Sequence, residues 1–319
     1  MAIAMKLHQV RDFIAIAESA SIRKAAKVLG LSQPALTKSL HRLEDEMHVQ
    51  LFARTARGVE LTPYGEVLLV RARLIEAESE RARQELAQMR GEREGTVTVG
   101  VSPTVATSLL PNVLMQFRKD YPNVGINIVG GLYYAHLPEL RAGTMDFAVG
   151  PVPAGVPNFE FASDVLFYNS TAIACRKGHS LRNATRLAEL EKAEWILYGP
   201  SRGGPGASII EAFQDAGLPP PRVMAQCNSI AGLVSVVART DILCVLPRQM
   251  LDQEPLCNGL HVMPIAQRLP RYPIVLMRKS TSPLTPVASH LATLLRRQVA
   301  YLNLDGHARP AKKAVALRG

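Results

Sequence analysis

The chain has 319 residues, of which 47% are hydrophobic and 20% are charged. This composition is typical of globular proteins, and the length suits two or three domains. Its 37 Lys and Arg residues outnumber its 27 Asp and Glu residues, so the formal net charge is +10. The sequence has no apolar run of the roughly 20 residues that cross a bilayer, which excludes a transmembrane protein. Because a signal-peptide pattern is also absent, we expect a cytoplasmic protein. The positive net charge favours a polyanionic partner, and a role in solubility alone is the alternative.

The first part of the chain predicts three short helices. Apolar residues recur at helical spacing from Leu7 onward, which indicates the first helix. Ser21 is a suitable N-cap for a second helix that ends at Gly30. Ser32 caps a third helix, with Pro34 in its first turn. Two short helices joined by a tight turn with glycine are typical of a helix-turn-helix unit.

The third helix has two faces of different chemistry. Leucines at positions 36, 40 and 43 are expected to pack inward, and the opposite face carries hydroxyl, amide and basic groups. Acids appear only from Glu44 onward. Such a face suits phosphate and base-edge contacts in a major groove, although a solvated face without a ligand has a similar pattern.

A hairpin with a basic tip follows over residues 51–61, as in the wing of a winged helix. Arg57 at the tip is suited to a minor groove, where negative potential attracts guanidinium groups, and Arg54 is better placed for phosphate. With the third helix, the predicted DNA contacts are Ser32, Gln33, Pro34, Thr37, Lys38, His41, Arg54 and Arg57.

Residues 7–65 carry the motifs of a known family. The run SQPALTKSLHRLE, followed by LFARTARGVELTPYG, resembles the DNA-binding domain of the LysR-type transcriptional regulators. The resemblance implies a winged helix-turn-helix domain at residues 1–62. Met47-His48 stands where the family usually has a leucine-glycine turn, which leaves the entry to the hairpin open. The positions that meet DNA in the family match Gln33, Pro34, Thr37, Lys38 and Arg57.

Residues 63–91 predict one long linker helix capped by Thr62. Its apolar and small residues alternate steps of 4 and 3, the spacing of a coiled coil. We expect a homodimer through this seam and therefore a roughly palindromic DNA operator. A single amphipathic helix packed on its own domain is the alternative. The seam residues are Leu68, Ala72, Ile75, Ser79, Ala82, Leu86 and Met89.

A hinge at residues 92–95 leads into alternating strands and helices over residues 96–302. This order predicts an α/β domain with parallel, doubly wound sheets. We expect two lobes, the first at about 96–165 and 268–302 and the second at about 166–267. Two such lobes resemble periplasmic binding proteins, as does the effector domain of the LysR family, whose first lobe matches LLPNVLMQFRKDYPNV and LRAGTMDFAVG. The resemblance implies a homotetramer through these domains and RNA polymerase as a further partner.

Three segments of this domain follow strands and open helices, where ligands of such sheets bind. They present hydroxyl and backbone donors, and helix N-termini favour anions. We therefore expect a small organic anion, a carboxylate or a sulfonate, between the lobes, with aromatic walls suited to an aromatic body. Ordinary helix capping is the alternative for each segment. The predicted effector contacts are Ser102, Pro103, Thr104, Tyr133, Tyr134, Gly150, Pro151, Ser201, Arg202, Gly203, Asn228 and Ser229.

Two stretches of the effector domain also resemble the toluenesulfonate-responsive branch of the LysR family. They are VSPTVATSLLP and SRGGPGASIIEAFQDAGLPPP. That similarity supports an organic anion without naming one, because pockets diverge faster than folds. The tail at residues 303–319 is basic, and we expect it to be disordered.

Patterns of catalysis and metal binding are missing from the sequence. HExxH, GxSxG, GxGxxG and P-loop motifs do not occur, the four cysteines form no CxxC pair, and the eight histidines show no paired ligand spacing. The sequence therefore predicts neither an enzyme nor a metal or cofactor. Two alternatives stay open. One is a redox-sensing regulator that uses Cys175 beside Arg176 and Lys177. The other is a small-molecule-binding protein without a transcriptional role.

Overall fold

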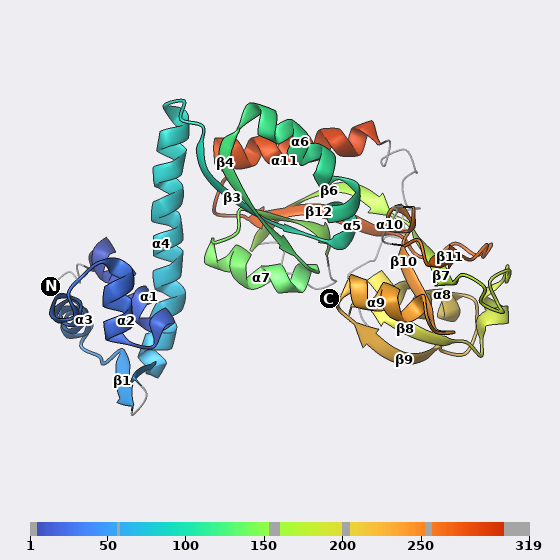
Figure 1. The fold of residues 1–319 in the computed structure, drawn as a ribbon, viewed down its shortest axis with the longest axis horizontal. Helices are drawn as coiled ribbons and strands as arrows, with labels where there is room; N and C mark the ends of the chain where they lie inside the picture. Colours follow the sequence, from blue (N-terminus) through green and yellow to red (C-terminus); the bar gives the residue numbers. More distant parts are fainter. Residues whose placement is uncertain (1–4, 56–57, 153–159, 200–204, 253–256, 303–319) are drawn as a thin grey trace, which may run out of the picture. The chain divides into compact units, whose positions relative to one another are not determined.

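The computed structural model describes residues 5–55, 58–152, 160–199, 205–252 and 257–302 (Figure 1). It divides into two compact units. The first comprises Met1–Glu94 with Pro138–Met145, and the second comprises Gly95–Leu137 with Asp146–Gly319. Among the helices described, none combines the length and the apolarity needed to cross a bilayer. The two units are described separately.

The first unit begins with a helix-turn-helix and a two-stranded hairpin, followed by one long helix. Its elements are α1 (Leu7–Ser19), α2 (Ile22–Leu29), α3 (Gln33–Met47), β1 (Phe52–Thr55), β2 (Gly58–Leu61) and α4 (Pro63–Met89). The predicted caps are confirmed, because Ser21 Oγ accepts the N–H of Lys24 and Ser32 Oγ accepts that of Ala35. Gly30 ends α2 with a φ of 66°, a left-handed conformation that glycine adopts without steric cost.

One apolar core joins the three short helices to the hairpin and to α4. Phe13 of α1 and Leu36 of α3 are fully buried in it. The Phe13 ring lies 5.3 Å from the ring of Phe52 on β1, measured between centroids. The inward face predicted for the third helix is thus confirmed by the burial of Leu36, Leu40 and Leu43.

Several of the residues predicted to form the seam of the long helix α4 pack against its own domain. Ala72 is 1% exposed in the core of the first unit, and Leu68 and Ile75 pack against the same core. In this half of the helix the stripe assigned to a partner therefore packs against α1 of the same chain, and self-pairing through α4 stays a prediction. Farther along, Leu86 and Met89 are exposed.

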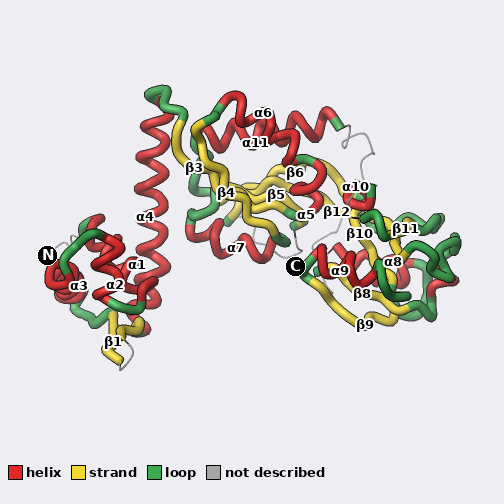
Figure 2. Tube along the Cα trace, viewed as in Figure 1, coloured by secondary structure: helices red, strands yellow, loops and turns green. Residues whose placement is uncertain are grey.

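The second unit contains two lobes, each built on a five-stranded sheet (Figure 2). In the first lobe the strand order is β4-β3-β5-β12-β6, and α6 and α11 cover one face of the sheet (Figure 1). Its strands are β3 (Glu94–Val101), β4 (Asn123–Gly130), β5 (Phe147–Pro151), β6 (Phe161–Asn169) and β12 (Tyr272–Lys279). Its helices are α5 (Pro103–Ser108), α6 (Leu110–Asp120), α7 (Tyr133–Ala142) and α11 (Pro286–Tyr301).

The second lobe has the strand order β11-β7-β10-β8-β9. Trp195 lies at the centre of its core, with its ring edge-on to Phe213 at 5.9 Å. Its strands are β7 (Thr171–Arg176), β8 (Glu194–Tyr198), β9 (Arg222–Cys227), β10 (Leu243–Pro247) and β11 (Leu260–Val262). Its helices are α8 (Ser208–Asp215), α9 (Ile230–Val237) and α10 (Arg248–Leu251), with short 3-10 turns at Leu187–Leu190 and Pro205–Ala207.

The α/β architecture with two lobes is confirmed, but several details differ from the expectation. The sheets are mixed, because β12 returns to the first lobe antiparallel to β5 and β6, and β7 runs antiparallel to β10. The unpredicted strand β6 extends the first lobe to Asn169, so the chain crosses later than residue 166. Gly150 and Pro151 lie within β5 and form no crossover.

Candidate DNA-binding face and effector site

The polar face of α3 has the geometry that the sequence predicts. Pro34, Lys38 and His41 are exposed, and Thr37 is half-buried. Together with Gln33, these residues line a shallow hollow of about 550 Å³ on the surface of the helix. The Thr37 hydroxyl donates to the Gln33 carbonyl at 2.9 Å. The face therefore offers one hydroxyl, one amide, one imidazole and one ammonium group on a single surface.

Lys38 is the unpaired cation of this face. Its ammonium makes no hydrogen bond or ion pair with the part of the chain that is described. Arg42, one turn farther along, is already engaged, since its guanidinium binds Glu46 at 2.9 Å. This pairing lowers the pKa of the Glu46 carboxyl below its ordinary value. An unpaired ammonium is free to bind phosphate, whereas a paired guanidinium must first exchange its partner.

Glu44 has a role that the sequence interpretation missed. It is buried, and its carboxylate accepts the backbone N–H groups of Leu51 at 2.7 Å and Phe52 at 3.4 Å. The carboxylate thereby fixes the start of the hairpin against α3. The signal in the sequence was an acid one residue after the inward-facing Leu43, at the edge of the apolar face.

His48 resolves the entry to the hairpin. It ends α3 with a φ of 56°, in the left-handed region where the family usually has glycine. Its backbone N–H donates to the Asp45 carbonyl at 3.3 Å, and Val49 N–H donates to the Glu44 carbonyl at 3.2 Å. The turn is thus the usual glycine-type helix end, formed by histidine at a steric cost.

The hairpin presents one of its two predicted basic contacts. Arg54 is exposed on β1, paired across the hairpin with Val59. Ser32 is occupied as the N-cap of α3. Arg57, the predicted tip residue, lies outside the described residues.

In the first lobe, Ser102 and Gly150 lie against each other. Ser102 is 3% exposed, and its hydroxyl has no hydrogen-bond partner among the described residues, although it stands at the N-cap position of α5. A Cβ atom on Gly150 would lie 3.1 Å from the Ser102 Cβ. Pro103 opens α5, and Thr104 is buried beside it. An unsatisfied buried hydroxyl is costly unless a ligand or water completes it.

Tyr134 and Asn228 link the two lobes. The Tyr134 hydroxyl donates to the Asn228 Oδ1 at 3.2 Å. Burial raises the pKa of Tyr134 above its ordinary value. Burial also raises the pKa of Tyr198, at the end of β8, and the nearby Tyr134 and Cys227 add to this shift. One of the three predicted segments, Cys227-Asn228-Ser229, therefore lies where the lobes meet.

Several other residues predicted to contact the effector make contacts within the fold itself. Ser229 caps α9, because its hydroxyl accepts the N–H of Gly232 at 3.2 Å, which is the capping alternative. Tyr133 is buried and its hydroxyl contacts the Met277 sulfur, and Pro151 is buried in β5. Their contacts with an effector remain predictions. Ser201, Arg202 and Gly203 lie outside the described residues.

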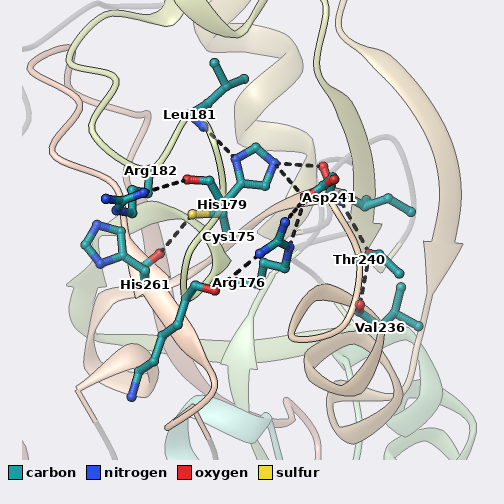
Figure 3. A network of polar contacts seen from close by, with 11 residues as sticks. Cys175, Arg176, His179, Leu181, Arg182, Val236, Thr240, Asp241 and His261 are labelled. Atoms are coloured by element: carbon teal, nitrogen blue, oxygen red, sulfur yellow. Dashed lines mark hydrogen bonds and ion pairs between the residues drawn. The ribbon is translucent and has the colours of Figure 1, made fainter.

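The cysteine proposed as a redox centre sits in a closed setting (Figure 3). Cys175 is fully buried, its thiol faces the His261 carbonyl at 3.8 Å, and burial raises its pKa. Arg176, which was expected to activate the thiol, instead binds Asp241 at 2.7 Å. The backbone carbonyl oxygen of Asp241 also lies within hydrogen-bond distance, 3.1 Å, of Nε2 in the buried His179 ring. A buried thiol with a raised pKa is a poor nucleophile.

Comparisons with known proteins decide the family. Residues 7–66 match the model of the bacterial regulatory helix-turn-helix protein of the lysR family, and residues 90–300 match that of the LysR substrate binding domain. The chain belongs to the LysR family of regulators. It is 30% identical over 296 residues to the HTH-type transcriptional regulator GbpR of Azospirillum brasilense, covering 92% of this chain and 86% of that protein.

Other relatives support the same assignment. The regulator is 26% identical over 258 residues to the HTH-type transcriptional regulator TdcA of Escherichia coli K12, with 81% of this chain and 82% of that protein covered. Its fold resembles the crystal structure of CbnR, a LysR family transcriptional regulator, with a TM-score of 0.67, 22% identity, and coverage of 92% and 99%. The regulator therefore combines a DNA-binding domain with an effector-binding domain, and it is not an enzyme.

Proposed function

We propose that this regulator binds a roughly palindromic operator as a homodimer, and that a small organic anion held between its effector lobes controls that binding. The observation that carries the effector proposal is the Ser102 hydroxyl, which is buried and unpaired next to Gly150. A carboxylate or sulfonate oxygen would accept a hydrogen bond from this hydroxyl. That bond would remove the free-energy cost of burying the hydroxyl without a partner.

The region where the lobes meet supports an anion with an apolar or aromatic body. Tyr134 spans from the first lobe to Asn228 of the second, so a ligand that breaks or replaces this contact changes how the lobes are held. Backbone N–H groups at the start of α9 add positive potential on the side of the second lobe. One relative, 26% identical over 293 residues, is named the SDS degradation transcriptional activation protein of a Pseudomonas strain. Dodecyl sulfate is an organic anion.

Effector control then follows from differential binding to two arrangements of the lobes. An anion that binds one arrangement more tightly shifts the population towards it, and the shift is limited by the difference in the two affinities. In a dimer, a change in the effector domains alters how two α3 helices reach paired half-sites. Exposed Tyr64, Val67 and Val70 on α4 support self-association there. The proposal includes a homotetramer through the effector domains, RNA polymerase as a partner and a cytoplasmic location.

The test uses the full chain and three matched probes, namely benzoate, toluene-4-sulfonate and neutral benzyl alcohol. Calorimetric titration measures affinity, and fluorescence anisotropy with the DNA upstream of its own gene measures operator binding. We expect the anions to bind, and Ser102→Ala to weaken their binding by roughly 10- to 150-fold, since a hydrogen bond to a charged group contributes roughly 1.5–3 kcal/mol.

Thr285→Ala is the matched control, because its buried hydroxyl caps α11 and is not among the predicted effector contacts, so this variant should affect stability more than anion affinity. Binding of the neutral probe alone would refute the anionic effector. Failure to bind any neighbouring promoter at moderate salt would refute the regulatory role independently, because that measurement involves no effector.

A further inference from the structure

The groove between α6 and α11, on the outside of the first lobe, is a second concave site. The two helices lie side by side over the sheet (Figure 1) and enclose a hollow of about 860 Å³. Met115, Gln116 and Lys119 line it from α6. Arg297, Gln298 and Tyr301 line it from α11. None of the effector contacts predicted from the sequence lies in this groove, and its volume is within the range of small-molecule sites.

The charges of the groove are positive. Lys119 and Arg297 line it from opposite helices, and neither makes a hydrogen bond or ion pair with any described residue. Nearby acids are already paired, because Asp120 binds His290 at 2.9 Å and Asp164 binds Arg296 at 2.7 Å. The hollow therefore has two unpaired cations and no lining carboxylate in the described chain, which favours an anionic ligand.

Gln298 supplies an independent sign of a missing acceptor. The residue is 4% exposed, and its side-chain Nε2 has no hydrogen-bond partner among the described residues. A buried amide N–H without a partner costs free energy, and an acceptor atom placed in the hollow would recover it. Gln116 adds a second amide from the facing helix. The polar groups thus complement a carboxylate, sulfonate or phosphate group.

Apolar surface stands beside these donors. Met115 is 62% exposed and Tyr301 is 79% exposed, although both are large apolar side chains. A thioether and a phenol ring are suited to a flat apolar body, because methionine adapts its shape and aromatic rings stack.

We propose that the α6–α11 groove binds a small organic anion with a planar apolar body, at a site separate from the one between the lobes. The acid group of the ligand lies between Lys119 and Arg297 and accepts from Gln298, and the planar body lies against Met115 and Tyr301. This proposal does not depend on the effector site, because it shares no residue with it.

The probe is naphthalene-1-sulfonate, and neutral 1-naphthalenemethanol is its uncharged counterpart. The full-length protein, with 13C-labelled methionine methyl groups, gives a direct reporter in Met115, whose signal is assigned by its loss in Met115→Leu. We expect a saturable shift of the Met115 signal with the sulfonate and none with the alcohol at equal concentration. An unmoved Met115 signal at about millimolar sulfonate, or an equal response to both probes, overturns the proposal.

A neighbouring residue provides a matched control. Lys119→Gln and Arg297→Gln should each weaken sulfonate binding by roughly threefold to tenfold, since each removes one charge-assisted contact. Arg118→Gln removes the same charge from the position next to Lys119, where the side chain does not line the groove, and should leave the affinity unchanged. Equal losses in all three variants would indicate nonspecific attraction and overturn the site.

Two further variants test whether a loss of affinity comes from a loss of stability, and whether the sulfonate binds in the groove or between the lobes. Gln298→Leu replaces the unsatisfied amide with an apolar group of similar size, so stability should hold while sulfonate affinity falls. If its affinity is unchanged, the assigned acceptor contact is wrong. Ser102→Ala should not alter the Met115 response, and a response that disappears in this variant would place the binding between the lobes instead.

Discussion

The Glu44 carboxylate accepts the backbone N–H of Leu51 at 2.7 Å, and this contact joins the recognition helix to the wing. Both groups are buried. The orientation of the hairpin relative to α3 is therefore set by a single side chain as well as by the apolar core. We predict that α3 and the hairpin contact DNA together, so this bond should affect operator affinity as well as stability.

Substituting Glu44 should show this coupling. Glu44→Ala leaves two buried N–H groups without an acceptor, so the free energy of unfolding should fall by about 1–3 kcal/mol. Glu44→Gln keeps an acceptor oxygen and should lose less. Urea unfolding measures both, and operator affinity should fall in the same order. Asp45→Asn, on the exposed neighbour, is the control, and an equal loss there would contradict the capping role of Glu44.

Replacing His48 by glycine should stabilise the DNA-binding domain. Its φ of 56° strains a residue with a Cβ atom, and glycine adopts that conformation without the clash. We expect His48→Gly to raise the free energy of unfolding by about 0.5–1 kcal/mol. Ala20→Gly, at a φ of 49°, should behave alike. Ala35→Gly, within regular α3, should instead destabilise; stabilisation by all three would indicate an effect unrelated to backbone strain.

The unpaired ammonium of Lys38 should contribute a counterion-releasing contact with DNA. Lys38→Gln should weaken operator binding and reduce the slope of log affinity against log salt by about one, as expected for one phosphate contact. Anisotropy titrations over a range of salt concentrations measure the slope. Lys192→Gln, an exposed lysine of the second unit, removes the same charge and should leave the slope unchanged. A constant slope in Lys38→Gln with relaxed base preference would mean that Lys38 reads a base edge.

Thiol reactivity should follow burial. Burial raises the pKa values of Cys175, Cys244 and Cys257, so less thiolate is present at any pH below those values. Half-buried Cys227 should therefore react first with iodoacetamide at about pH 8, while the three others react only on unfolding. Peptide mass spectrometry identifies the modified residue. Rapid modification of Cys175 in the folded protein would revive the redox-sensing alternative.

The local features of the DNA-binding domain were predictable from sequence because they depend on neighbouring residues. At Ser21 and Ser32 the hydroxyl that caps the helix accepts a hydrogen bond from the N–H group only three residues later, so the cap can be read from the local sequence. The two faces of α3 follow from the spacing of its apolar residues alone. The effector domain was less readable. The strand β6 and the antiparallel return of β12 depend on pairing across more than a hundred residues, which no local pattern encodes.

The candidate sites divide in the same way. The sequence sufficed to identify the family, the exposed polar face of α3 and the placement of Ser102 and Ser229 at helix starts, since these follow from residue type and spacing. Only the tertiary structure distinguished a working cap at Ser229 from the unsatisfied hydroxyl of Ser102. It also assigned Ala72 to its own domain and buried Glu44 beneath the wing. Whether a polar group is satisfied, or an apolar stripe is covered, depends on residues distant in the chain, and folding alone brings them together.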